Sequence, residues 1–206
     1  MPNERVVLDA DDMRRTLVRI AHEIVEKNAA TAEAGNEPPV LAVVGIHRRG
    51  AYLARRLHEL VSDLLAADVP SGELDISFCR DDLGRRAEAP TVHATHLDFH
   101  IDGATVVIVD DVLYTGRTVR AAIDALFDYG RPARVQLAVV ADRGHRELPI
   151  RPDYVGKNLP TARGERVNVH VEELDGVDEV TITENALQRP EADGLLQNAG
   201  PDAPRR

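Results

Sequence analysis

The chain has 206 residues, 43% of them hydrophobic, which suits one domain with a real core and is too apolar for a disordered chain. A single cysteine, Cys79, excludes an internal disulfide, and no run approaches the roughly 18 apolar residues that span a bilayer. We therefore expect a soluble, cytoplasmic protein with no membrane partner. The formal net charge of −10 argues against general binding to nucleic acid, and DNA is not an expected partner. Residues 172–206 contribute nine acidic and three basic residues, a net −6, so the remaining body is closer to neutral.

The first half of the chain predicts two helices and two strands. Asp9 is placed to cap a helix that begins near Ala10 and has an apolar face between residues 17 and 24. The apolar run 40–46 is typical of a strand buried on both faces of a parallel sheet. The other expected elements are a linker over 31–39, a helix over 51–66, a strand over 73–78 and a flexible loop over about 80–100.

The second half predicts two further buried strands that flank a helix. The run 104–111 ends in two carboxylates, Asp110 and Asp111, and the helix over 115–129 is terminated by a Gly-Arg-Pro sequence. The other expected elements are strands over 134–142, 153–156 and 166–171 and a disordered acidic tail over 184–206.

Strands that alternate with helices predict an α/β domain over residues 1–183 with a mainly parallel central sheet. Ligands on such sheets bind at the carboxyl ends of the strands, where the loops gather. The candidate binding loops are therefore 47–50, 110–118 and 142–157.

The run VVIVDDVLYTGRT (106–118) carries the strongest chemical signal. Amides at a helix start are unpaired and lie at the positive end of the helix dipole, and Gly116 allows close approach of a phosphate. Two carboxylates nearby suit vicinal hydroxyls, so the run predicts a site for ribose 5-phosphate. The alternative is an aspartate pair that only caps the next helix. Neither a Walker loop nor a dinucleotide fingerprint is present.

This run resembles the phosphoribosyl pyrophosphate signature of type I phosphoribosyltransferases. Within that superfamily the chain resembles the PyrR family, which comprises pyrimidine operon attenuation regulators with uracil phosphoribosyltransferase activity. The resemblance implies a mainly parallel sheet flanked by helices, with a small hood built from the N-terminal residues and 143–182. The matching segments are RIAHEIVEKN (19–28), GIHRRGAYLARRL (45–57), ELDISFCRDDL (73–83), DDVLYTGRTVRAAIDAL (110–126) and GRPARVQLAVVADRGHRELPIRPDYVGKNLPT (130–161).

The resemblance also implies roles for individual residues. Asp110, Asp111 and Arg80, at the base of the flexible loop, are the catalytic candidates. Arg48 departs from the family, which has a small hydroxyl residue there, and it either strengthens pyrophosphate binding or faces solvent. Mg²⁺ is implied as a cofactor held mainly by the substrate pyrophosphate and water, so no protein metal ligand is expected. The expected substrate-binding residues are Arg48, Arg49, Gly50, Arg80, Asp110, Asp111, Val112, Leu113, Tyr114, Thr115, Gly116, Arg117, Thr118, Arg143, Val155, Lys157 and Val167.

The implied reaction converts uracil and phosphoribosyl pyrophosphate to UMP and pyrophosphate. The implied second activity is UMP- or UTP-dependent binding of a leader mRNA hairpin, and a homodimer or larger homo-oligomer is expected. The alternatives are a salvage phosphoribosyltransferase for uracil or a purine without RNA regulation, and a basic stripe that is only a solvated helix face. Val18 departs from the threonine of RNA-binding members. The expected RNA-binding residues are Arg19, His22, Lys27, His145, Arg146, Arg151 and Lys157.

Arg19 and Arg146 offer a way to separate the two activities. Neither residue lies within the 110–118 loop. The sequence therefore predicts that replacing both with alanine weakens RNA binding and spares catalysis.

Overall fold

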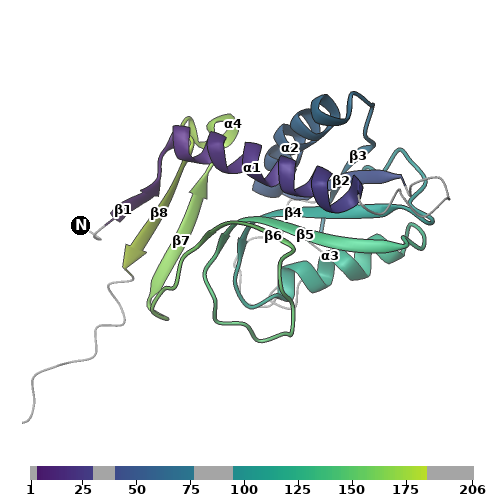
Figure 1. The fold of residues 1–206 in the computed structure, drawn as a ribbon. Helices are drawn as coiled ribbons and strands as arrows, with labels where there is room; N and C mark the ends of the chain where they lie inside the picture. Colours follow the sequence, from purple (N-terminus) through teal and green to yellow (C-terminus); the bar gives the residue numbers. More distant parts are fainter. Residues whose placement is uncertain (1–3, 30–39, 77–94, 185–206) are drawn as a thin grey trace, which may run out of the picture.

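The computed structural model describes residues 4–29, 40–76 and 95–184, and within them it has eight strands and four helices (Figure 1). Cys79, Arg80, the linker over 31–39 and the tail from 185 onward lie outside the described residues. The elements in chain order are β1 (Glu4–Leu8), α1 (Ala10–Ala29), β2 (Leu41–Ile46), α2 (Arg49–Leu65), β3 (Ser71–Leu74), β4 (Thr105–Leu113), α3 (Arg117–Phe127), β5 (Arg134–Asp142), β6 (Tyr154–Asn158), β7 (Glu165–His170), α4 (Glu172–Asp175) and β8 (Glu179–Glu184).

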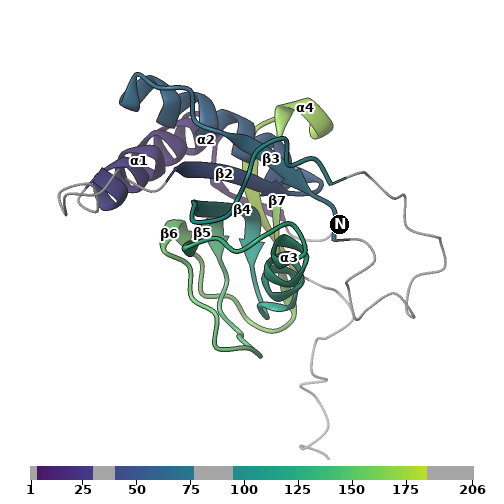
Figure 2. The same ribbon diagram turned by 90° about the vertical axis from the view of Figure 1, so that its right-hand side faces the viewer.

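The central sheet has five parallel strands in the order β3-β2-β4-β5-β6. Helices α1 and α2 cover one face of this sheet and α3 covers the other (Figures 1 and 2). β4 lies in the middle, and its alternate side chains enter two separate cores. Val107 and Val109 pack with α1 and α2, whereas Val106 and Ile108 pack with α3. This is the continuous apolar pattern expected of a strand buried on both faces.

A second, antiparallel sheet has the order β1-β8-β7 and forms the hood. Its residues Val167, Val169 and Ile182 join the same core as α1 and α2, so the hood and the central sheet share one apolar interior. α4 connects β7 to β8 and lies beside the start of α2 (Figure 1). No helix among the described residues is long and apolar enough to cross a membrane.

Most of the predicted elements are confirmed, with shifted ends. Asp9 accepts a hydrogen bond from the Asp12 amide at 2.8 Å and so caps α1 as predicted. The strand predicted over 134–142 is β5 without change. The strand predicted to end at Asp111 continues to Leu113, because residues 112 and 113 pair with Ala141 and Asp142 of β5. The prediction that the aspartates end the strand is therefore wrong by two residues.

Candidate active site

The segment from the end of β4 into the first turn of α3, which we call the phosphate loop (residues 114–118), has the geometry of an anion site. Gly116 precedes the helix with φ of +93°, a left-handed conformation that favours glycine. The first main-chain bond of α3 runs from the Arg120 amide to the Gly116 carbonyl at 3.0 Å, so the amides of residues 117–119 precede the helical ladder. The sequence prediction of a glycine-led helix start is confirmed, although the helix begins at Arg117 rather than Thr115.

The two aspartates stand directly before the phosphate loop. Asp110 is only 6% exposed, and its Oδ1 accepts the Asp111 amide at 2.9 Å. Asp111 is half-buried, and its Oδ1 accepts the Val112 amide at 2.7 Å. These local bonds hold the two carboxyl groups at the carboxyl end of the central strand, directly before the phosphate loop.

The 47–50 loop lies against the same edge. A Cβ atom placed on the buried Gly50 would stand 2.5 Å from the Val109 carbonyl oxygen and 3.3 Å from the Asp110 Cα. Only glycine permits this approach of α2 to β4. Arg48 is exposed and its side chain does not cap α2. The structure therefore brings the predicted pyrophosphate loop next to Asp110.

Arg49 and Arg56 of α2 hold the hood in place. Arg49 donates to both carboxylate oxygens of Asp175 at 2.8 and 3.2 Å, and Arg56 binds Glu173 and Asp178. Burial acts to raise the pKa of the Asp175 and Asp178 carboxyls, but hydrogen bonds from the two arginines and from backbone amides outweigh it and leave each pKa below its usual value. We call this set of five residues the hood latch.

The segment 142–150 covers the phosphate loop from the other side. Arg143 is only 7% exposed, stacks over the ring of Tyr114 with 4.2 Å from Cζ to the ring centroid, and donates to the Glu165 carbonyl at 2.7 Å. Its Nε has no partner among the described residues. Tyr114 itself is 40% exposed. Arg143 therefore joins the phosphate loop to β7 of the hood.

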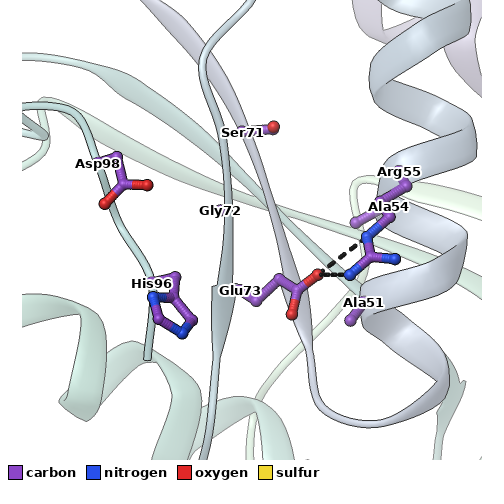
Figure 3. A pocket seen from close by; sticks show the side chains of 8 residues that line it. All are labelled: Ala51, Ala54, Arg55, Ser71, Gly72, Glu73, His96 and Asp98. Carbon is purple, nitrogen blue, oxygen red and sulfur yellow. Dashed lines mark hydrogen bonds and ion pairs between the residues drawn. The ribbon is translucent and has the colours of Figure 1, made fainter. Parts of the chain in front are cut away.

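A shallow pocket lies at the outer edge of the sheet, two strands from β4 (Figure 3). Glu73 of β3 projects into it and binds Arg55 of α2 at 2.6 and 3.0 Å. The other oxygen of Glu73 pairs with Nε2 of His47 at 2.9 Å. Glu73 thus supports the 47–50 loop from outside. The pocket is lined by Ala51, Ala54, Arg55, Ser71, Gly72, Glu73, His96 and Asp98.

The basic residues predicted to bind RNA fall into two groups. Arg19, His22 and Lys27 are exposed on α1, and Arg19 donates to the Val155 and Gly156 carbonyls of β6 at 2.9 and 2.7 Å. Lys157, at the end of β6, donates to the Val7 carbonyl at 3.1 Å. In the second group, His145 and Arg146 belong to the 142–150 segment that covers the phosphate loop, and Arg151 directly follows it.

Some predicted substrate residues are placed away from an open surface, and some important residues were not predicted. Val167 packs in the core, and Val155 is half-buried on β6. The hood-latch carboxylates and Glu73 were missed, because their partners are distant in sequence and no local motif marks them. A surplus of acidic residues near 172–179 is the one signal that the sequence offers for the hood-latch carboxylates, and Glu73 has none.

Comparison with known proteins agrees with this geometry. The family model described as phosphoribosyl transferase domain matches residues 10–173, which defines the class of the chain. The bifunctional protein PyrR of Roseiflexus sp. (strain RS-1) is 58% identical over 87% of this chain and 94% of that protein. The bifunctional protein PyrR of Chloroflexus aurantiacus is 56% identical over 88% of this chain and 96% of that protein. The chain belongs to the PyrR family of phosphoribosyltransferases.

Solved structures of lower identity share the fold. The hypoxanthine phosphoribosyltransferase of Trypanosoma cruzi is 17% identical with a TM-score of 0.63, over 87% of this chain and 96% of that one. The Staphylococcus aureus enzyme is 18% identical with a TM-score of 0.61, over 89% and 93%. The predicted type I phosphoribosyltransferase fold is confirmed.

Proposed function

We propose that the chain transfers ribose 5-phosphate from phosphoribosyl pyrophosphate to uracil, which forms UMP and pyrophosphate. The observation that carries this proposal is the meeting of the aspartate pair, the phosphate loop and the 47–50 loop at one edge of the parallel sheet. Membership of the PyrR family supports uracil as the acceptor.

The residues have distinct tasks in this reaction. The amides of the phosphate loop bind the 5-phosphate, and Asp110 and Asp111 accept hydrogen bonds from the ribose hydroxyls. The bond from the anomeric carbon to pyrophosphate breaks, a bond to the uracil ring nitrogen forms, and that nitrogen loses its proton to one of the two aspartates. Because positive charge develops on the ribose, the adjacent carboxylates stabilise the transition state.

The pyrophosphate leaves from the side of the 47–50 loop. Arg48 and the amides near Gly50 are the proposed contacts, because Arg49 is engaged by Asp175. Arg80, which lies outside the described residues, is a further candidate from the sequence. Magnesium would be held here mainly by the oxygens of the pyrophosphate and by water, the hard donors that this ion prefers, with no protein side chain as a ligand. When bound, the ion neutralises charge on the leaving group.

An acceptor panel tests the catalytic proposal. Purified protein with phosphoribosyl pyrophosphate and Mg²⁺ is offered uracil, hypoxanthine or guanine, and nucleotide and pyrophosphate are both quantified. We expect uracil-dependent formation of UMP with matching pyrophosphate. Turnover with a purine and none with uracil would reassign the base preference to the alternative, a purine salvage enzyme.

We further propose that the protein binds leader mRNA of pyrimidine genes when UMP or UTP is bound. The exposed basic residues on α1 and at the end of β6, Arg19, His22, Lys27 and Lys157, support this proposal, as does the bifunctional naming of the relatives. Binding of labelled leader RNA and a scrambled control, each with and without UMP, tests it. Equal weak binding of both RNAs, unaffected by UMP, would leave a salvage enzyme alone.

A further inference from the structure

Arg146 lies among the proposed RNA-binding residues, yet its side chain is directed into the protein. Its Nη1 donates to the Tyr114 carbonyl at 2.8 Å and, in longer contacts, to the Leu113 carbonyl at 3.4 Å and the Gly144 carbonyl at 3.3 Å. Its Nε donates to the Ile150 carbonyl at 3.0 Å, and its Nη2 binds Asp142 Oδ2 at 2.5 Å. The side chain is 22% exposed.

These contacts engage every nitrogen of the guanidinium. An arginine has five N–H donors in a planar fork, and here the fork joins the end of β4 to both ends of the 142–150 segment. A guanidinium in this state cannot also bind an RNA phosphate in a bidentate manner unless it abandons the loop carbonyls. Arg146 lies outside the 110–118 loop in the sequence, but its side chain contacts that loop directly.

The phosphate loop has further contacts with the same segment. The amides of Glu147 and Leu148 donate to the Thr115 carbonyl at 3.0 and 3.1 Å, and Arg117 Nε binds Glu147 Oε2 at 2.8 Å. Arg146 fixes the two carbonyls that precede these contacts. The carbonyls of 113–115 are thus all held by the 142–150 segment. Because the N–H of a trans peptide points opposite to its C=O, the amides of residues 114–116 point away from that segment.

We propose that Arg146 is a positioning residue for the phosphate loop, and that its influence on RNA binding acts through nucleotide affinity. By holding the Tyr114 carbonyl, it keeps the amides of residues 115–118 oriented toward the 5-phosphate before the ligand arrives. Such preorganisation lowers the ordering cost of binding. This inference rests on the proposed function, because the ligand is the UMP or phosphoribosyl pyrophosphate of that site.

The first test compares nucleotide affinity in two variants. Arg146→Gln removes the clamp, whereas Arg120→Gln removes an equal charge from the exposed face of α3, where Arg120 pairs with Asp124 at 3.5 Å. Titration calorimetry with UMP and with phosphoribosyl pyrophosphate is expected to show binding weaker by about tenfold or more for Arg146→Gln and by less than about twofold for Arg120→Gln. In the uracil reaction, Arg146→Gln is expected to raise the KM for phosphoribosyl pyrophosphate more than it lowers kcat.

Two more variants guard against a fold defect. Asp142→Asn weakens the partner of Nη2 and retains the side-chain size, and Arg146→Lys retains charge but cannot reach Tyr114, Ile150 and Asp142 together. Both are expected to have intermediate UMP affinity. Melting without ligand shows whether each variant is folded, and only folded variants are compared.

RNA-binding measurements distinguish an effect of Arg146 through nucleotide affinity from a direct contact between Arg146 and RNA. Leader-RNA binding by Arg146→Gln is expected to recover at saturating UMP, whereas Arg151→Gln, which alters an exposed residue of the same surface, is expected to stay weak at any UMP concentration. Folded Arg146 variants that bind UMP within about twofold of the wild type would overturn the inference. Failure of the wild type to bind UMP would instead refute the proposed function itself.

Discussion

Replacing Gly50 by alanine tests how closely the 47–50 loop must approach the aspartate pair. The new methyl group would lie 2.5 Å from the Val109 carbonyl oxygen, whereas ordinary contacts begin near 3.4 Å, so the start of α2 must retreat by about 0.9 Å. Overpacking of this kind costs about 1–3 kcal/mol of unfolding free energy. A displacement of about 1 Å in a reacting group lowers turnover by about 100-fold, so we expect a loss of this order in kcat/KM for phosphoribosyl pyrophosphate.

A matched glycine distinguishes the local effect from a general loss of stability. Gly103 has φ of +71°, and a methyl group added to it would meet nothing within 4 Å, so Gly103→Ala costs about 1–2 kcal/mol in backbone strain without touching the site. Both variants are expected to melt at lower temperature, by about 2–4 °C for each kcal/mol, and only Gly50→Ala is expected to lose activity. Wild-type kinetics in folded Gly50→Ala would refute the reasoning.

Three further predictions concern the site, the hood latch and assembly. Asp110→Asn and Asp111→Asn each lose a charge-assisted hydrogen bond of about 1.5–3 kcal/mol, so uracil transferase rates are expected to fall about 10- to 150-fold. The circular dichroism spectrum should stay unchanged, and wild-type rates in both variants would remove the pair from the site. The pKa of Asp178 is lowered in the folded state. The ionised carboxylate therefore adds to the free energy of unfolding above the unfolded pKa of about 3.9, and this stabilisation is lost as the pH falls through the folded pKa. Asp178→Asn should therefore lower the melting temperature at pH 7, and this deficit should shrink as the pH falls below the unfolded pKa toward the folded one; an equal deficit at every pH would contradict this. Sedimentation is expected to show a dimer or larger assembly, and only a 22.6 kDa monomer at micromolar concentration would argue against it.

The central sheet could be predicted from the sequence because its signals are local. The buried runs at 40–46, 104–111 and 134–142 are largely apolar, and turn residues bound them. β1 and β8 were not predicted. They are short, they mix polar and apolar residues, and they pair with each other across the whole chain, with Glu4 opposite Thr183. Nothing local in either segment indicates that pairing.

The candidate site also has features that the sequence predicts and features that only the structure shows. Gly116 and the two aspartates form one contiguous motif, so their arrangement followed from the sequence once a strand and a helix were placed around them. The roles of Arg49, Arg56 and Arg146 could not follow, because each is set by a partner on another element, such as Asp175 or the Tyr114 carbonyl. A sequence shows that an arginine is present but not whether it faces a ligand, a carboxylate or a carbonyl.

A crystal structure of the protein with bound UMP tests the central claim most directly. We expect the 5-phosphate on the amides of residues 115–118, the ribose hydroxyls within hydrogen-bond distance of Asp110 and Asp111, and Arg146 still bound to the Tyr114 carbonyl. UMP bound elsewhere, for example in the pocket beside Glu73, with the phosphate loop vacant, would contradict it.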